Sequence, residues 1–224
     1  MNSAIILAAG SGTRFDSEIP KQFTYLENEK MMVVEHSIIK FCNHTNIDEI
    51  ILVCSKEWSK NLEKKYQDFD ILNSKKMIYT QGGNSRTDSS YRGLKKCSKN
   101  SINVLIHDAA RPFVTNKIIN DALLYLDKFD AAIPTINCND SLINIETLQY
   151  LQREQIKFIQ TPQAFKYNKI FQSYEKLAKS DSSKKFSDDL SVLLKYNNTA
   201  RAKFFDGNKS NFKITQKDDL KKIK

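Results

Sequence analysis

The sequence predicts an α/β protein built on a doubly wound, mostly parallel sheet. Two observations carry this prediction. Short runs rich in β-branched residues alternate along the chain with segments of helical periodicity, and these short runs are nearly continuously apolar. Strands of a parallel sheet have this pattern because helices cover both of their faces. A Rossmann-like fold is therefore expected, and 224 residues are enough to bury one large core.

Four strands and two helices are expected in the first half of the chain. The strands are "AIILAA" (4–9), "EIILVC" (49–54), "KMIYTQ" (76–81) and "NVLIHDAA" (103–110). The helices are "MMVVEHSIIKFCNH" (31–44), whose apolar residues form a buried stripe, and "RTDSSYRGLKKC" (86–97). Ligands of such sheets bind at the carboxyl ends of the strands, so the loops after Leu7, Thr80 and Ile106 are predicted to form the site.

Residues 137–158 interrupt this alternation. Two polar extended stretches around Asn144–Glu146 predict a projecting β-arm, and the arm is too polar to bury itself. It is expected to lie against another surface, such as a second subunit. Helices at 167–180 and from Asp188 follow, and "NFKIT" (211–215) is expected to be a late strand. No linker separates two domains, so one domain spanning 1–224 is expected.

The net charge of +9 raises the question of nucleic-acid binding. The lysines are scattered, alternate with acidic residues and do not interleave with aromatic residues, which is typical of a solvated surface. A basic chain also suits a small anionic substrate. A nucleotide-binding or nucleic-acid-associated protein without enzymatic activity is kept as the alternative from a different class.

The distribution of cysteines and histidines indicates that the protein has no zinc site and resides in a reducing compartment. The four cysteines, Cys42, Cys54, Cys97 and Cys138, are far apart and the three histidines are dispersed. The start "MNSAIILAAG" lacks a basic segment, and no apolar run is long enough to span a bilayer. A cytoplasmic protein that does not bind membranes is expected.

The first loop has the features of a phosphate-binding cradle. Residues Ala8 to Gly12 have small side chains, so a ligand can approach their backbone N–H groups. The loop matches neither G-x-x-x-x-G-K-[ST] nor G-x-G-x-x-G. Arg14 and Lys21, which follows the stiffening Pro20, add two cations. A cradle with two cations suits a triphosphate, whereas the glycines alone would be explained by a tight strand-to-helix turn.

Other charged side chains are expected near the strand ends. Asp108 could hold Mg²⁺ or substrate hydroxyls, and Arg111 could contact phosphate or brace Asp108; a structural salt bridge is the alternative. Lys213 is expected to face inward between Phe212 and Ile214, which is costly unless it meets an anion. Thr87, Asp88 or Ser89 is expected to cap the second helix, and the pair Asp188 and Asp189 to cap a later one.

Six motifs in order resemble those of the cytidylyltransferases that act on sugar-alcohol phosphates. They are "LAAGSGTRF" with "PKQF", "GGNSRTDSSYRGL" (82–94), "HDAARPFV" (107–114), "QTPQAF" (160–165), "SDDLSVL" (187–193) and "NFKIT" (211–215). The likeness is greatest to the 2-C-methyl-D-erythritol 4-phosphate cytidylyltransferases of non-mevalonate isoprenoid synthesis. Ribitol-5-phosphate cytidylyltransferases are near relatives.

The resemblance implies a set of roles for individual residues. The catalytic residues would be Arg14, Lys21, Arg153 and Lys213. The CTP-binding residues would be Ala8, Ala9, Gly10, Ser11, Gly12, Thr13, Gly83, Arg86 and Ser89. The residues for the acceptor and its phosphate would be Asp108, Arg111, Ser141, Arg153, Thr161 and Lys213. The metal, Mg²⁺, would be held by Asp108 and Asn211.

The resemblance also implies the reaction and the assembly. CTP and a polyol phosphate would give a CDP-alcohol and pyrophosphate, in a homodimer whose arm reaches the neighbouring site. The chain has Leu142-Ile143-Asn144 where many members carry a basic residue, so ribitol 5-phosphate or another polyol phosphate stays open as the acceptor. An acceptor phosphate is mostly dianionic at neutral pH, so no enzyme nucleophile is needed.

Overall fold

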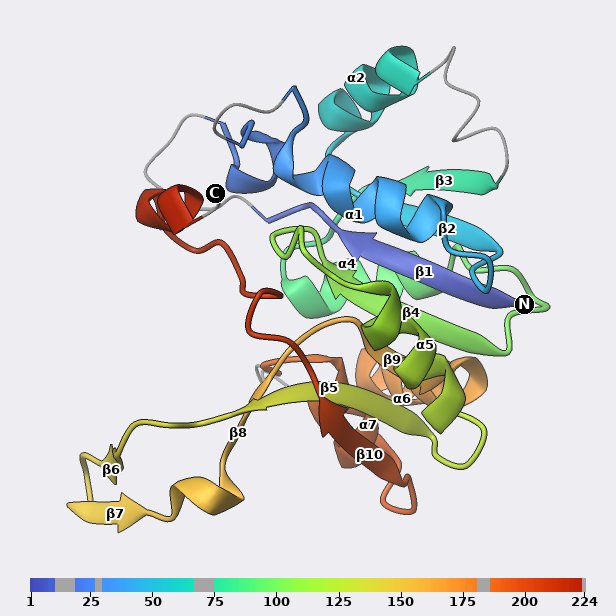
Figure 1. Cartoon of the computed structure of the whole chain (residues 1–224). Coiled ribbons are helices and arrows are strands. Elements are labelled where there is room, and N and C mark those ends of the chain that lie inside the picture. The colour runs from blue at the N-terminus through green and yellow to red at the C-terminus, as the bar shows by residue number, and fades with distance from the viewer. Residues whose placement is uncertain (11–18, 27–29, 67–74, 181–185, 223–224) are drawn as a thin grey trace.

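The computed structural model describes residues 1–224 except 11–18, 27–29, 67–74, 181–185 and 223–224. Its main sheet has eight strands in the order β10-β5-β9-β4-β1-β2-β3, with β8 paired to β5 (Figure 1). The strands are β1 (Asn2–Leu7), β2 (Glu49–Val53), β3 (Lys76–Thr80), β4 (Asn103–Asp108), β5 (Ala131–Asn137), β8 (Lys157–Ile159), β9 (Gln163–Lys166) and β10 (Ala202–Asp206). β1 pairs in parallel with β2 and β4, β2 with β3, and β10 with β5, whereas β9 is antiparallel to β4 and β5, and β8 to β5. The mostly parallel sheet expected from the sequence is confirmed.

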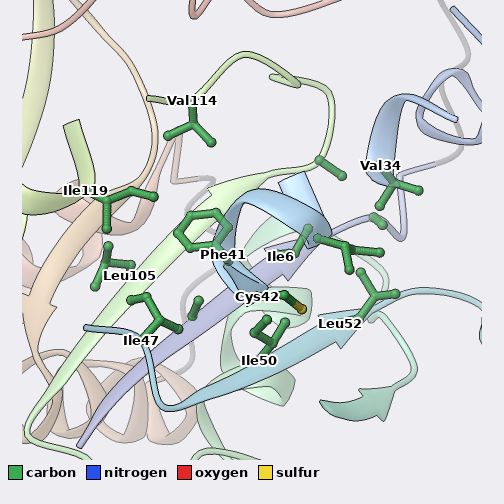
Figure 2. Packing of buried hydrophobic residues seen from close by; sticks show 14 of the residues in the cluster. Ile6, Val34, Phe41, Cys42, Ile47, Ile50, Leu52, Leu105, Val114 and Ile119 are labelled. Carbon is green, nitrogen blue, oxygen red and sulfur yellow. The ribbon is translucent and has the colours of Figure 1, made fainter. Parts of the chain in front are cut away.

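Helices cover both faces of this sheet. They are α1 (Val33–Cys42), α2 (Lys56–Tyr66), α4 (Arg86–Leu94), α5 (Asn116–Tyr125), α6 (Tyr167–Lys179) and α7 (Asp189–Tyr196). Ile6 packs with residues of α1 and α5 in one hydrophobic cluster (Figure 2), whereas Ile5 packs with residues of α4, α6 and α7 in another. Neighbouring strand residues face opposite sides of a sheet, so the continuous apolar runs arise from burial on both faces. Each fully buried Ile or Leu stabilises the fold by about 1.5–3 kcal/mol.

The predicted β-arm is present as a hairpin that projects from the sheet (Figure 1). Its strands are β6 (Leu142–Asn144) and β7 (Gln149–Leu151), paired antiparallel, and the 3-10 turn η3 (Arg153–Gln155) leads back to β8. The hairpin exposes large apolar side chains, with Ile145 at 83% and Tyr150 at 77% exposure. Apolar side chains on a thin projecting hairpin have no core of their own to enter.

One sequence prediction of local structure differs from what is observed. Residues 211–215, expected as a strand, form no strand, and the Ile214 N–H donates to the Ala110 carbonyl at 2.9 Å. The last strand is β10 instead, because it completes the sheet beside β5. Among the residues that the structure describes, none of the helices has the length and apolarity required to cross a membrane.

Candidate active site

A cavity of about 480 Å³ lies where β1 and β4 end. It is bordered by the loop after β1, by the segment from Gly83 to Ser89 at the start of α4, and by the segment after β10 that carries Lys213 and Thr215. Its lining residues are Leu7, Ala9, Gly10, Lys21, Gln22, Gly83, Asn84, Ser85, Arg86, Ser89, Asp108, Ala110, Lys213 and Thr215. This cavity therefore lies at the strand ends, which is the location predicted from the sequence.

The loop after β1 and the loop before α4 approach each other closely at Gly82. A Cβ atom added to Gly82 would overlap the Ala9 Cβ and would lie 3.0 Å from Ser89 Oγ. Only glycine lets the two backbones come this near, because it has no side chain. The Gly83 N–H donates to Ser89 Oγ at 3.1 Å, which holds the second loop against α4.

The N-terminal cap of α4 is Ser85, whose Oγ accepts from Asp88 N–H at 3.0 Å. The expectation that Thr87, Asp88 or Ser89 would cap this helix was therefore wrong. The helix begins at Arg86, one residue before the earliest of those three, because Ser85 already has the extended backbone of a cap.

The segment "PKQF" forms the 3-10 turn η2 (Lys21–Phe23) directly after Pro20. Lys21 lines the cavity, and the buried Gln22 side chain donates from Nε2 to the carbonyls of Ala8 (2.7 Å) and Gly10 (2.8 Å). Phe23 anchors the turn on the other side by stacking on Trp58 with 4.0 Å between ring centroids. The predicted site residues Ser11, Gly12, Thr13 and Arg14 lie outside the described residues.

A chain of alternating charges crosses the floor of the cavity. Asp108 accepts from Arg86 Nε at 3.1 Å and from Lys213 Nζ at 2.7 Å. Arg86 also donates from Nη1 to Asp189 at 2.8 Å, and the Tyr174 hydroxyl donates to the same carboxylate at 2.6 Å. Each buried charge therefore faces one of opposite sign, which offsets the cost of removing it from water.

These ion pairs decide the protonation states. Burial alone would raise the pKa of Asp108, but the positive charges of Arg86 and Lys213 hold that pKa well below its usual range. Burial lowers the pKa of Arg86, and Asp189 and Asp108 more than reverse this effect. Asp108 is thus a carboxylate and Arg86 a cation at any physiological pH.

His107 is a structural residue of the strand end. Its Nε2 lies 2.9 Å from the Arg111 carbonyl, which only accepts, so Nε2 carries the proton. Its Nδ1 accepts from the Thr161 hydroxyl at 3.1 Å, and that hydroxyl in turn accepts from Asp108 N–H at 3.0 Å. Burial lowers the pKa of His107 to about 4, so the imidazole is neutral. Thr161 holds Asp108 through these contacts and does not line the cavity.

Arg111 and Asn211 also lie behind the cavity wall. Arg111 donates from Nη1 to the Asn211 carbonyl at 2.8 Å, and burial lowers its pKa. Asn211 is fully buried, and its Nδ2 donates to the Thr161 carbonyl at 2.8 Å. The Asn211 Oδ1 atom accepts no hydrogen bond from any described residue. The substrate role of Arg111 and the metal role of Asn211 remain predictions.

Arg153 and Ser141 are not brought to the cavity of their own chain. Arg153 lies at the base of the arm, where Nη1 donates to the Asn139 carbonyl at 3.1 Å and Nε pairs with Glu154 at 3.2 Å. It lines a separate hollow of about 440 Å³ together with Lys157. Ser141 is exposed on the arm. Within one chain, therefore, the structure assembles a nucleotide-sized site without these two residues.

A divalent cation fits the residues at Asp108. No three His, Cys, Asp or Glu side chains gather within the described part of the chain. Mg²⁺ does not require such a cage, because it takes one or two carboxylates and fills its other positions with water and substrate phosphates. The Asp108 carboxylate is ionised, and each of its oxygens has a second lone pair beyond the hydrogen bonds above.

Two residues of this site were not recognised from the sequence. Gln22 is next to Lys21 in the motif, but its side chain is uncharged and gave no signal of a role at the site. Its hydrogen bond to the Ala8 carbonyl is seen only in the folded structure. The sequence predicts Asp189 to cap the helix together with Asp188. Asp188 is that cap, and Asp189 lies in the first turn, where the predicted dipole contact is favourable. Asp189 is also fully buried and pairs with Arg86, which the sequence did not indicate. Asp188 has the extended backbone of a cap whereas Asp189 begins the helix, so the two carboxylates have different environments.

A small-residue loop, an ionised carboxylate and three cationic side chains converge at the carboxyl ends of parallel strands. This arrangement defines the chain as an α/β protein of the nucleotide-binding class. A family model described as 2-C-methyl-D-erythritol 4-phosphate cytidylyltransferase matches residues 2–224. The chain belongs to this family, and it is a cytidylyltransferase, which is a kind of nucleotidyltransferase.

Individual relatives agree with this assignment. The 2-C-methyl-D-erythritol 4-phosphate cytidylyltransferase of Clostridium botulinum (strain Okra / Type B1) is 39% identical over 223 residues, covering 98% of this chain and 94% of that protein. The protein of that name from Clostridioides difficile (strain 630) is 36% identical over 227 residues, covering 98% and 91%. The crystal structure of 4-diphosphocytidyl-2C-methyl-D-erythritol synthase from Anaerococcus prevotii DSM 20548 has a TM-score of 0.83 at 29% identity, covering 98% of this chain and 92% of that one.

Proposed function

We propose that this protein transfers CMP from CTP to 2-C-methyl-D-erythritol 4-phosphate. The products are 4-diphosphocytidyl-2-C-methyl-D-erythritol and pyrophosphate, in the non-mevalonate route to isoprenoid precursors. The observation that carries the proposal is the position of Asp108 between Arg86 and Lys213, in a cavity between the two close loops. The names of the relatives supply the acceptor.

The two loops are proposed to hold the nucleotide. The base lies between Ala9 and the Gly83–Ser89 segment, where backbone N–H groups and the Ser89 hydroxyl read its polar edge. Ala8, Gly10, Ser11, Gly12 and Thr13 complete the backbone around the phosphates. A backbone cradle suits a polyanion because its N–H groups are fixed in place before the ligand arrives.

The reaction requires charge neutralisation more than proton transfer. The acceptor phosphate has its second pKa near about 6, so at neutral pH it attacks the α-phosphorus as a dianion. The main barrier is repulsion between this dianion and the triphosphate. Arg14 and Lys21 are proposed to stabilise the transition state and the leaving pyrophosphate, and Lys213 to orient the attacking phosphate. No enzyme nucleophile or general base is needed.

Asp108 is proposed to hold Mg²⁺, with Asn211 as the second candidate ligand. A bound Mg²⁺ supplies further positive charge to the phosphates. Asp108 contributes a carboxylate that stays ionised at neutral pH, because Arg86 and Lys213 keep its pKa low. Arg86 keeps this carboxylate in place through its second ion pair with Asp189.

The protein is proposed to act as a homodimer of single-domain chains, each comprising residues 1–224 with a dimerisation arm at about 137–158. Support comes from the exposed apolar side chains of the hairpin and from the distance of Arg153 and Ser141 from their own cavity. The arm would deliver Arg153 and Ser141 to the acceptor phosphate in the site of the neighbouring subunit. Thr161 and Arg111 would support the strand end that faces this phosphate. A cytoplasmic location, without nucleic-acid or membrane partners, completes the proposal.

The test is pyrophosphate release by the purified protein with CTP and a panel of acceptors. We expect turnover with 2-C-methyl-D-erythritol 4-phosphate and Mg²⁺, and a much lower kcat/KM with ribitol 5-phosphate. Higher efficiency with ribitol 5-phosphate would overturn the acceptor assignment while leaving CMP transfer intact. Absence of CTP binding together with salt-dependent binding to duplex DNA would overturn the proposal as a whole.

A further inference from the structure

Gln22 joins two parts of the cavity that are separated by the undescribed segment 11–18. Its carboxamide is buried at 4% exposure and donates both Nε2 hydrogens, one to the Ala8 carbonyl at 2.7 Å and one to the Gly10 carbonyl at 2.8 Å. Lys21, the adjacent residue of the same 3-10 turn, lines the cavity. One side chain thus ties the turn that carries a cation to the loop that carries the backbone cradle.

These two hydrogen bonds fix the orientation of the loop. A trans peptide is planar, so its C=O and N–H groups point in opposite directions. With the Ala8 carbonyl directed at Gln22, the N–H of Ala9 is directed away from Gln22. Ala9 is also the residue against which Gly82 packs, so the position of Ala9 sets the separation of the two loops. The Ala8 N–H is fixed independently by the Val53 carbonyl at 2.7 Å.

The carboxamide of Gln22 meets the hydrogen-bonding requirement of both carbonyls. Two carbonyl oxygens need two N–H donors on one planar group, which a carboxamide supplies and a carboxylate does not. The stacking of Phe23 on Trp58 fixes the position of the 3-10 turn, and with it the backbone of Gln22. The buried glutamine lines the cavity wall without being an obvious phosphate ligand.

We propose that Gln22 is a positioning residue for CTP, which holds the Ala8–Gly10 backbone and the Lys21 turn in the single arrangement that accepts the nucleotide. This inference rests on the proposed function, because it takes CTP as the occupant of the cavity. Gln22 acts through the loop and through Lys21, and it takes part in no bond-making step.

The test compares Gln22→Met and Gln22→Glu with the wild type. Methionine keeps the volume of the glutamine side chain and removes both N–H donors. Glutamate keeps the shape of the side chain but places a carboxylate oxygen, which cannot donate, against the Ala8 and Gly10 carbonyls. We expect the Kd for CTP, measured by titration calorimetry with Mg²⁺, to rise about tenfold or more in Gln22→Met and further in Gln22→Glu. The KM for the acceptor is expected to change less than twofold.

The control is Ser101→Ala, at the opposite end of β1. Ser101 is buried and shares hydrogen bonds with Ser3 and Glu49, so its loss lowers thermal stability without reaching the cavity. We expect Ser101→Ala to lower Tm and keep the wild-type Kd for CTP.

Three results would count against these proposals. A Gln22→Met variant with a Kd within twofold of the wild type overturns the inference alone. So does a Gln22→Glu variant that binds better than Gln22→Met, because shape rather than donors would then matter. A wild-type protein that binds no CTP overturns the proposed function and the inference with it.

Discussion

Adding one methyl group at Gly82 should separate the two loops that form the cavity. The new Cβ would lie well inside 3.0 Å of the Ala9 Cβ, whereas ordinary van der Waals contact begins at 3.4 Å. The Ala9 Cβ is fixed directly by its backbone, so relief of this overlap requires the loops to move apart by about 1 Å. A displacement of about 1 Å in a positioned active site can cost about 10²-fold in rate. We therefore expect kcat/KM for CTP to fall about 10²-fold in Gly82→Ala.

The assay is pyrophosphate release with CTP varied at saturating acceptor, accompanied by thermal melting. Gly93→Ala is the matched control because it also adds a methyl group in a tight place, on α4. Its Cβ would meet Ile5 Cγ2 at 2.7 Å and Val53 Cγ2 at 3.1 Å, inside the core. Such overpacking costs about 1–3 kcal/mol of stability. Because the contacts of this Cβ are with core side chains, we expect CTP kinetics to change much less than in Gly82→Ala. Wild-type CTP kinetics in Gly82→Ala, or an equal loss in Gly93→Ala, would refute the reasoning.

Other outcomes concern the charges and the pH dependence. Lys21→Ala should lower kcat by about 10²–10³-fold with an unchanged circular-dichroism melt, and near-normal turnover would contradict the mechanism. Asp189→Asn should lower the free energy of unfolding in urea by about 3 kcal/mol because a buried arginine loses its charged partner. Asp188→Asn should cost less, about 1 kcal/mol, because asparagine caps helices equally well but its amide nitrogen cannot accept the hydrogen bond from Gln163 Nε2; equal losses in the two variants would refute this distinction. His107 has a folded pKa of about 4, below the unfolded value of about 6.5, so the unfolded state takes up the proton first as pH falls. Urea unfolding should show about 3 kcal/mol less stability at pH 4 than at pH 7, and His107→Asn should reduce this slope.

The sheet was predictable because burial on both faces leaves a strong signal in the sequence. Ile5 and Ile6 are both fully buried on opposite faces, so the run around them is apolar throughout. α2 was not predicted, although Trp58, Leu62 and Tyr66 lie four residues apart and contact the core, because only Leu62 is fully buried and the residues between them are polar or charged. The segment 211–215 has the composition of a strand, but the hydrogen bond of Ile214 to the loop after β4 fixes its conformation. That contact depends on tertiary structure and has no local signal.

The site was predictable where its residues follow strand ends and unpredictable where it depends on distant pairing. Gly83, Asp108 and the first loop could be placed from the order of strands alone. The partnership of Arg86 with Asp189 spans 103 residues, and it exists only because α7 packs beside α4 and α6. Charge and spacing in a sequence do not specify such a pair.

The alternating charges beneath the cavity have a consequence for the resting protein. Arg86 and Lys213 are balanced by Asp108 and Asp189, so these four groups sum to zero before any ligand arrives. The Lys213 side chain is 38% exposed and lies at the accessible end of the series. Its ammonium can exchange a carboxylate oxygen for a phosphate oxygen without leaving Asp108 unneutralised, because Arg86 stays bound to it. Asp108 and Asp189 are thus internal counter-ions of the two cations, and a substrate phosphate takes the place of Asp108 at Lys213.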